Sequence, residues 1–529
     1  MTHMNCQTTE ATGSATERAG GTKIWNAIFF LAFAFYVCST LAVLSHVVTW
    51  CDPAWYSYNA IDFYYGRDIG TNQHIAEHIA DSSPHGFAFF GYDMRTNIGW
   101  QATVAAMYKI LGVSLFAANL TSFVFSLLTI LVVYGIVKEI YGEAALSAQA
   151  GILLILDYQM FWMATMARPD MAAMFFGLLG IHLMLLYRRT GRRLLPFLAA
   201  VAWSIGFTMH LLMIFFPVAY MLTSQTATLR SKRGRLREYL KTSWPIILAF
   251  FLFGVFTLFY YHAYSQSLNR WVSTAGSRWS LSRGIYQEFY VKILEVFVHR
   301  YSLPLLMLFV LFVAFAVVSA IRRRNGKTLA VFGAMLCVTA LGVLVDQNAG
   351  SPRLLYYSPF LALFTALGLR VVLPALRYKS LRILAVGLVV LAMLLPRALK
   401  YGQIIHNWHG TDYAAFIAEV KETIPPNSVI AGDMVLIWGL HDYGVKLIDP
   451  CYFFRDSKGI PLDRSYADVV EYVVIDDDFF RKSSEKDAFL AMFHGSLSKI
   501  ADIQGKGDYG YHCKIFRHSV GRPVTNGAR

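Results

Sequence analysis

The chain of 529 residues is 56% hydrophobic and only 15% charged, whereas about a quarter of the residues of a typical soluble protein are charged. Repeated apolar runs of roughly 18 to 25 residues exclude a soluble globular protein and predict a polytopic α-helical membrane protein. The net charge of +14 suggests a nucleic-acid partner at first. The basic residues lie in short loops between apolar runs, however, so we predict no nucleic-acid partner.

Residues 1–22 are polar, small and rich in Gly and Thr, which predicts a disordered N-terminus. The apolar run 23–48 is too long for a signal peptide and lacks a small-residue cleavage site, so it predicts a retained first span. About eleven transmembrane helices are expected. The later spans are predicted at 114–137, 144–163, 169–187, 194–208, 211–224, 244–264, 300–321, 328–345, 354–374 and 382–398.

Basic loops give the orientation. Even numbers of predicted spans separate these loops, so all of them lie on one face, which the positive-inside rule makes cytoplasmic. They are Arg188–Arg193, Arg230–Arg237, Arg322–Lys327 and Arg377–Arg382. Anionic lipid headgroups are their expected partners. The N-terminus is then cytoplasmic, the first loop 49–112 and everything after Lys400 lie outside, and the expected location is the cell (inner) membrane.

The composition changes after Lys400. The runs S-V-I-A-G-D, E-Y-V-V-I-D and Y-H-C-K-I-F predict short strands, and H-N-W-H-G-T-D-Y-A-A-F-I-A-E-V predicts an amphipathic helix with Thr411 as a possible cap. We therefore expect a transmembrane domain over 23–399 and an extracytoplasmic α/β domain over 400–529. Cys451 and Cys513 share that domain, where an oxidising compartment allows a bridge. Two cysteines in one domain need not lie within bonding distance, so their pairing stays open.

Several polar groups fall at the predicted outer ends of separate spans. An ionisable group at a bilayer edge costs free energy and is usually there for function. A carboxylate can deprotonate an acceptor hydroxyl, and cations can hold a phosphate and offset the charge that builds on it. Asp157 lies toward the same side and is a weaker candidate. The main candidates are Asp68, Asp170, Arg168, His210 and Arg353.

The order of motifs resembles the class C glycosyltransferase fold, in particular the aminoarabinose transferases and the protein O-mannosyltransferases. In that family the first loop helix typically begins with Asp-Glu, followed by an aromatic residue four positions after the Asp. Here Asp68 is followed by Ile69 and Asn72, while Ile75 and Ala76 keep the family's spacing. The departures leave Asp68 as the only acid of that pair and put metal binding in doubt. Metal and other cofactors are therefore left open.

Later motifs extend the resemblance from about Lys23 to Arg397. M-A-R-P-D-M matches the position of the family's second acidic residue, G-F-T-M-H-L-L resembles a segment with a basic residue between short helices, and S-P-R-L-L-Y-Y-S-P resembles its Arg-aromatic-Pro motif. The resemblance implies an inverting enzyme that moves a sugar from a polyprenyl-phosphate donor to a cell-envelope glycan, lipid or protein on the outer face. In that reading Asp68 and Asp170 are catalytic, and the substrate or its phosphate is bound by Arg168, His210 and Arg353.

Other interpretations of the same residues stay open. Asp170 beside Arg168 would also suit an ion pair that anchors its span, and Asp68 would suit a helix cap. His210 would suit a structural hydrogen bond, and Arg353 would suit a side chain that reaches lipid headgroups. The alternative function is a transporter or flippase of lipid-linked saccharides. Transporters usually show internal repeats and polar groups at mid-membrane, whereas this chain gathers its polar groups at one edge, which favours the enzyme.

Overall fold

The computed structural model describes residues 6–49, 51–66, 97–231, 236–263, 303–345, 351–448, 470–475, 483–493, 496–504 and 509–519. Its contacts divide the chain into two compact units. The first, called the helical unit below, comprises Met1–Ala42, Ser122–Thr165 and Pro169–Lys400. The second, called the mixed unit, comprises Val43–Thr121, Met166–Arg168 and Tyr401–Arg529.

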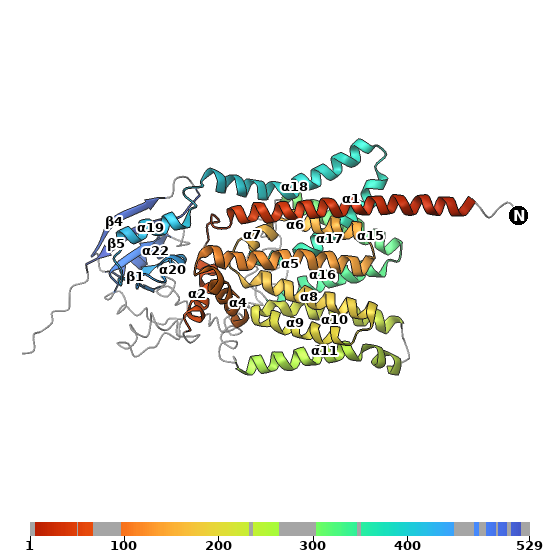
Figure 1. The fold of residues 1–529 in the computed structure, drawn as a ribbon, viewed down its shortest axis with the longest axis horizontal. Coiled ribbons are helices and arrows are strands. Elements are labelled where there is room, and N and C mark those ends of the chain that lie inside the picture. Colours follow the sequence, from red (N-terminus) through yellow and green to blue (C-terminus); the bar gives the residue numbers. More distant parts are fainter. Residues whose placement is uncertain are drawn as a thin grey trace, which may run out of the picture. The chain divides into compact units, whose positions relative to one another are not determined.

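The helical unit is built from helices, most of them long (Figure 1). Their bounds are α1 Cys6–Val43, α5 Leu115–Tyr141, α6 Ala144–Leu156, α7 Tyr158–Ala164, α8 Pro169–Thr190, α9 Leu194–Met209, α10 Phe215–Ser231, α11 Leu236–Ala263, α15 Leu303–Arg322, α16 Gly326–Val345, α17 Ser358–Ala375 and α18 Lys379–His406. Two 3-10 turns precede α10 and α17, namely η2 Leu211–Ile214 and η5 Ser351–Tyr357.

Among the described helices, 6 are long and apolar enough to cross a membrane, and the bent pair of α6 and α7 makes up to 7. The chain is thus a multi-pass membrane protein. Shorter apolar helices occur in α9, α10, α11 and α16. The expected total of about eleven spans stays a prediction.

Two predicted segments differ in detail. The run 144–163, predicted as one span, is bent by 63° between α6 and α7. The cause is Asp157, whose carboxylate accepts a hydrogen bond of 2.9 Å from the Gln159 backbone N–H and starts a new helix there. In addition, α1 begins at Cys6, although composition predicts disorder over 1–22. Once an apolar span has nucleated a helix, adding residues to it costs little.

Glycines bring α9 and α10 close to α8. A Cβ at Gly180 would lie 2.1 Å from the indole nitrogen of Trp203, and one at Gly177 would lie 2.4 Å from the Phe216 ring. The Trp203 indole also donates a hydrogen bond of 3.2 Å to the Gly177 carbonyl. Small residues at such contacts let membrane helices approach closely. This packing fixes α8 against the segment between α9 and α10, which carries one of the candidate residues.

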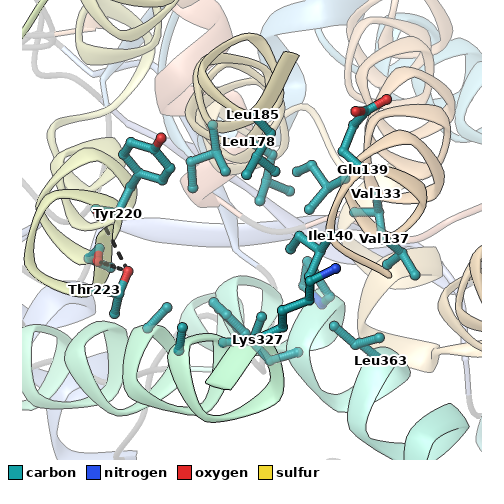
Figure 2. Close-up of a pocket in the computed structure, with 18 of the residues that line it drawn as sticks. Val133, Val137, Glu139, Ile140, Leu178, Leu185, Tyr220, Thr223, Lys327 and Leu363 are labelled. Carbon is teal, nitrogen blue, oxygen red and sulfur yellow. Dashed lines mark hydrogen bonds between the residues drawn. The ribbon is translucent and has the colours of Figure 1, made fainter. Parts of the chain in front are cut away.

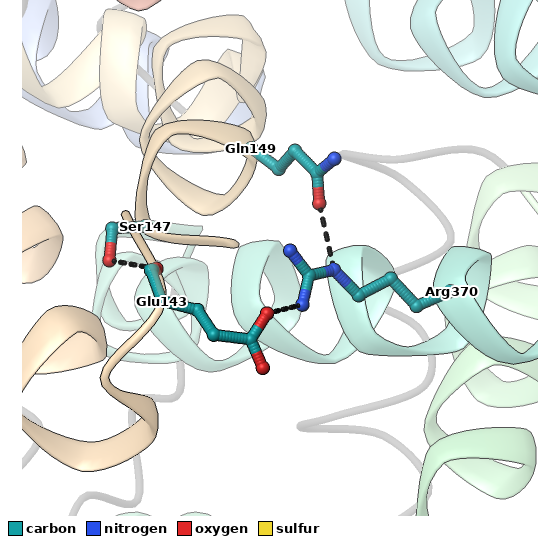
Figure 3. Close-up of polar contacts among 4 residues, drawn as sticks. All are labelled: Glu143, Ser147, Gln149 and Arg370. Carbon is teal, nitrogen blue, oxygen red and sulfur yellow. Dashed lines mark hydrogen bonds and ion pairs between the residues drawn. The ribbon is translucent and has the colours of Figure 1, made fainter. Parts of the chain in front are cut away.

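A polar cluster ties α6 to α17 (Figure 3). The Arg370 guanidinium on α17 forms an ion pair with Glu143, the residue before α6. The same guanidinium donates from Nε to the Gln149 side-chain oxygen at 3.1 Å. Glu143 is largely exposed, so we assign this pair at most about 1 kcal/mol.

The mixed unit contains a five-stranded sheet of order β2-β1-β3-β5-β4. The strands are β1 Val429–Gly432, β2 Lys446–Ile448, β3 Tyr472–Ile475, β4 Leu497–Gln504 and β5 His512–His518. β1 pairs in parallel with β2 and β3, whereas β5 pairs antiparallel with β3 and β4. Every residue of the central β3 is buried, as its unbroken apolar sequence requires. The three runs predicted as strands are β1, β3 and β5.

Helices complete this unit. They are α2 Cys51–Tyr64, α4 Ile98–Leu111, α19 Tyr413–Thr423, α20 Ile437–Leu440 and α22 Ser483–Ala491, with a 3-10 turn η6 at Met434–Leu436. The predicted amphipathic helix is α19. Its cap is Asp412, whose carboxylate accepts from the backbone N–H groups of Ala414 and Ala415, so the predicted cap at Thr411 is wrong. The Thr411 hydroxyl donates instead to the Trp408 carbonyl.

The first loop and the tail belong to this one unit although they are far apart in sequence. The Trp438 indole donates to the Tyr108 hydroxyl at 2.9 Å. The Tyr511 hydroxyl donates to the Val47 carbonyl at 3.3 Å. These contacts join α4 and the end of the α1 region to the tail residues, and the sequence pattern did not predict them.

Candidate functional site

Asp170 lies in the first turn of α8, directly after Pro169. Proline suits this position because its missing N–H would have no helical partner there. The Asp170 side chain is fully buried. A carboxylate at a helix N-terminus is favoured by the helix dipole, and a buried one needs polar partners to offset the loss of water. Asp170 thus lies at the start of the helix, as predicted, and is buried inside the protein.

His210 separates α9 from η2. Its backbone is extended, with φ −157 and ψ 134, and its Nδ1 accepts a hydrogen bond of 3.2 Å from the Leu212 backbone N–H. The side chain is buried. With Nδ1 as an acceptor the imidazole is neutral and its proton is on Nε2, which can donate a hydrogen bond. The hydrogen bond to Leu212 supports the structural interpretation of His210.

Helix α8 carries Asp170 and is in contact with the turns next to His210 and around Arg353. η2, which follows His210, packs against α8. η5, which contains Arg353, packs against α7, α8, α16 and α17. Asp170, His210 and the backbone of Arg353 are thus supplied by α8 itself and by two short turns that touch it.

Arg168 belongs to the mixed unit. Its side chain is buried, and its guanidinium carbon lies 5.2 Å from the centroid of the Tyr56 ring on α2. This is the geometry of a cation–π contact. Arg168 therefore packs on a helix of the first loop.

Asp68 and Cys451 lie outside the described residues. The shared cavity of all five candidates and the Cys451–Cys513 bridge accordingly stay predictions. Cys513 itself is buried in β5.

Arg397, which is not among the residues predicted from the sequence, is buried in α18. Its Nη1 donates to the Ile155 carbonyl at 2.8 Å, and its Nη2 donates to the Ser39 hydroxyl at 3.0 Å. The guanidinium carbon lies 4.9 Å from the ring centroids of both Tyr36 and Phe161. Planar guanidinium groups combine stacking with directed hydrogen bonds in this way. One arginine thus joins α1, α6, α7 and α18.

The position of Ile155 explains this contact. Ile155 lies in the last turn of α6, and carbonyl groups in the last turn of a helix have no partner further along it. Arg397 supplies that partner next to the bend. An arginine inside an apolar span is a functional or structural signal by itself, so the sequence did contain the information that could have identified it.

Two histidines of the mixed unit are partly withdrawn from water. Burial lowers the pKa of His46, although the nearby Asp412 carboxylate opposes the shift. Burial also lowers the pKa of His441, and Asp442 opposes it. The His441 ring nitrogen Nδ1 lies 2.9 Å from the Tyr65 hydroxyl, and the His46 ring stacks on Trp408 at 3.5 Å between centroids. Folding therefore favours the neutral imidazoles.

Metal ligation has no support in the described part of the chain. There, no group of three or more His, Cys, Asp or Glu side chains could hold a metal ion. Asp68 is not among these residues, so the question of a metal at the predicted site stays open.

Comparisons with known proteins identify the fold. The family model described as dolichyl-phosphate-mannose-protein mannosyltransferase matches residues 98–262. The structure of ArnT from Cupriavidus metallidurans bound to undecaprenyl phosphate has 13% identity and a TM-score of 0.58, over 94% of this chain and 98% of that one. The apo oligosaccharyltransferase of Archaeoglobus fulgidus has 12% identity and a TM-score of 0.53, over 85% of this chain and 69% of that one. No curated protein matches the chain.

Because the sequence identities are only 13% and 12%, these similarities establish the fold and nothing more. The expected class C glycosyltransferase fold is confirmed.

Proposed function

We propose that this chain is an integral membrane glycosyltransferase that uses a polyprenyl-phosphate-linked sugar. The observation that carries the proposal is the likeness to ArnT, which extends over 94% of the chain. That structure holds undecaprenyl phosphate, and the matching family model is described by dolichyl phosphate mannose. Both names refer to polyprenyl phosphates, so they support the same class of donor. The acceptor is a glycan, a lipid or a protein of the cell envelope.

The proposed reaction is one displacement at the anomeric carbon. The Asp68 carboxylate takes the proton of the acceptor hydroxyl, whose oxygen bonds to the anomeric carbon as the bond from that carbon to the phosphate oxygen breaks. The leaving group is the polyprenyl phosphate, and Arg353 and Arg168 offset its charge. Asp170 orients Arg168 or supports the acceptor. A single displacement inverts the configuration of the sugar.

The geometry of the helical unit supports these roles. Asp170 is buried in the first turn of α8, and His210 is buried where α9 ends, with its Nδ1 held by the Leu212 backbone N–H. The turn η2, which follows His210, and the turn η5, which contains Arg353, both pack against α8. A group of polar residues on neighbouring elements is what a site at a membrane edge requires.

The proposal includes an orientation. The positive-inside rule assigns the basic loops to the cytoplasm, so the N-terminus is cytoplasmic, and the transfer site and the domain 400–529 face outward in the inner membrane. The donor's lipid tail stays in the bilayer while its phosphate reaches the outer edge. The four basic loops on one predicted face, Arg188–Arg193 among them, support this arrangement.

The substitution Asp68→Asn tests the proposal because it keeps the shape of the side chain and removes its basicity. We expect transfer to fall by about 10²–10⁴-fold, the usual contribution of a general base, while expression and donor binding persist. Asp93→Asn is the matched control, since Asp93 is another acid of the first loop, and it should remain active. Full activity of Asp68→Asn would end the assignment of the base.

A further inference from the structure

A pocket with a volume of about 540 Å³ lies inside the helical unit, among α5, α8, α10, α16 and α17. Figure 2 shows residues that line it. Its walls are mainly apolar and include Val133, Val137, Leu178, Leu185 and Leu363. Pockets of about 300–1,000 Å³ are typical of small-molecule sites. The pocket extends toward the end of the unit where α8 finishes and α16 begins, whereas Asp170 lies at the start of α8. It is therefore separate from the candidate transfer site.

The length of the pocket matches one leaflet of a bilayer. Its lining on α8 runs from Leu178 to Arg189, a distance of about 16 Å at the rise of an α-helix. The hydrocarbon core of a bilayer is about 30 Å thick, so the pocket covers about half of it. An apolar slot of that length fits an acyl chain.

Cations line one end of the pocket, called its mouth below, where α8 finishes and α16 begins. Arg188, Arg189 and Lys327 all line the pocket. Arg189 pairs with Glu139 at 2.8 Å. Within the described part of the chain, neither Arg188 nor Lys327 forms an ion pair, and both are exposed. Two cations therefore remain for an anion at the mouth.

Tyr220 adds an independent indication of a ligand. It lines the pocket, its side chain is 6% exposed, and its buried hydroxyl makes no hydrogen bond to any described residue. The Arg188 guanidinium carbon lies 5.5 Å from the centroid of the Tyr220 ring, which brings the ring close to one of the two cations. A buried hydroxyl without a partner costs free energy, and an oxygen atom of a ligand would remove that cost.

We propose that this pocket binds one anionic glycerophospholipid of the leaflet that faces the basic loops. One acyl chain lies between α8, α10 and α16, the phosphate contacts Arg188 and Lys327, and Tyr220 donates to a headgroup or ester oxygen. The proposal does not depend on the transfer reaction. A polyprenyl phosphate fits less well, because its chain is longer than a slot of one leaflet and its phosphate is expected at the opposite end of the helices.

The test uses the full-length protein in nanodiscs of phosphatidylcholine that contain traces of phosphatidylglycerol with a photoreactive group on one acyl chain. We expect labelling of peptides that contain Leu178–Leu185 or Ala330–Ala334. The double variant Arg188→Gln/Lys327→Gln should reduce it, by about fivefold for each cation. Arg192→Gln/Arg193→Gln also removes two positive charges, from exposed positions just after α8 that do not line the pocket, and should leave the labelling unchanged.

A second pair of variants separates the pocket from its charge. Ala330→Phe fills the slot and should abolish the labelling, whereas Leu336→Phe, at an exposed position of the same helix, should retain it. Thermal melting should show that phosphatidylglycerol stabilises the wild type and the Leu336→Phe protein, but not the Ala330→Phe protein.

Three results would overturn the proposal. One is equal labelling by a phosphatidylcholine probe, and another is an equal loss in the Arg192/Arg193 control, since either would mean a non-specific surface. The third is displacement of the probe by an equimolar polyprenyl phosphate, which would assign the pocket to the donor lipid.

Discussion

The two units use buried polar groups for different purposes. In the helical unit, Arg397 and His210 lie at interruptions of helices, where they bind the backbone of Ile155 and Leu212. In the mixed unit, the Trp438–Tyr108 bond joins segments that are 330 residues apart. In a bilayer a broken helix has no water to satisfy its backbone, so side chains must do it. The Trp438–Tyr108 bond, by contrast, joins two side chains and satisfies no backbone group.

The largest expected effect is that of Arg397→Met. The substitution leaves the Ile155 carbonyl without a partner next to the bend, and we expect the free energy of unfolding to fall by about 3 kcal/mol. Thermal unfolding in detergent, followed by size-exclusion chromatography, measures the loss. Arg382→Met is the control, because Arg382 lies on the same helix but is exposed. Equal melting of the two variants would remove the distinction between the units.

A smaller effect is expected from the hydrogen bond between Trp438 and Tyr108. Tyr108→Phe leaves the buried Trp438 indole without its partner, which costs about 1–3 kcal/mol. Trp438→Phe should cost more, because it also removes packing volume. The double variant should be less destabilised than the sum of the two. If the losses in the free energy of unfolding of the two single variants simply added up in the double variant, the bond would provide no coupling between the first loop and the tail.

The smallest effect is a dependence on pH that should be confined to the mixed unit. Burial holds the pKa values of His46 and His441 below their ordinary value of 6.5. The unfolded chain therefore binds protons first as the pH falls through 6.5. The contribution of these histidines to stability is complete above that pH and decreases below it. Both rings are partly exposed, so the change is modest.

Melting between pH 7.5 and 5.5 measures this dependence. His441→Gln should reduce the slope of melting temperature against pH. His409→Gln, at an exposed position in the same unit, should leave the slope unchanged. A steeper slope in His441→Gln than in the wild type would contradict the assignment.

Local sequence patterns predicted much of the fold. Long apolar runs located the described helices that are long and apolar enough to cross a membrane, and short β-branched runs located β1, β3 and β5. Pro169 marked the start of α8 correctly. In each case the signal is carried by residues close together in the chain. The same patterns placed Asp170 and His210 at the ends of helices, where they are found.

The remaining features depend on contacts that no local pattern contains. The bend at Asp157 interrupts a run that is apolar on both sides, and one capping carboxylate decides it. Arg397 reaches Ile155 and Ser39, which are 242 and 358 residues away. Thr411 and Asp412 are both good caps, so only the geometry distinguishes them. The union of the first loop with the tail also required tertiary contacts.

The bent pair of α6 and α7 is a feature that transporters of lipid-linked saccharides often share. Here the side chains of Arg397 and Asp157 form hydrogen bonds with backbone groups at the bend. A bend whose polar groups are paired in this way is structural, whereas a transport site would need those groups to bind its cargo.

The most direct test of the account is covalent transfer without a sealed membrane. The purified protein in detergent receives a polyprenyl-phosphate-linked sugar and an extract of envelope acceptors, and mass spectrometry follows the release of polyprenyl phosphate. We expect release that requires the acceptor and is lost in Asp68→Asn. No release in detergent, together with movement of the intact lipid-linked sugar across sealed vesicles, would exclude the glycosyltransferase and identify a flippase.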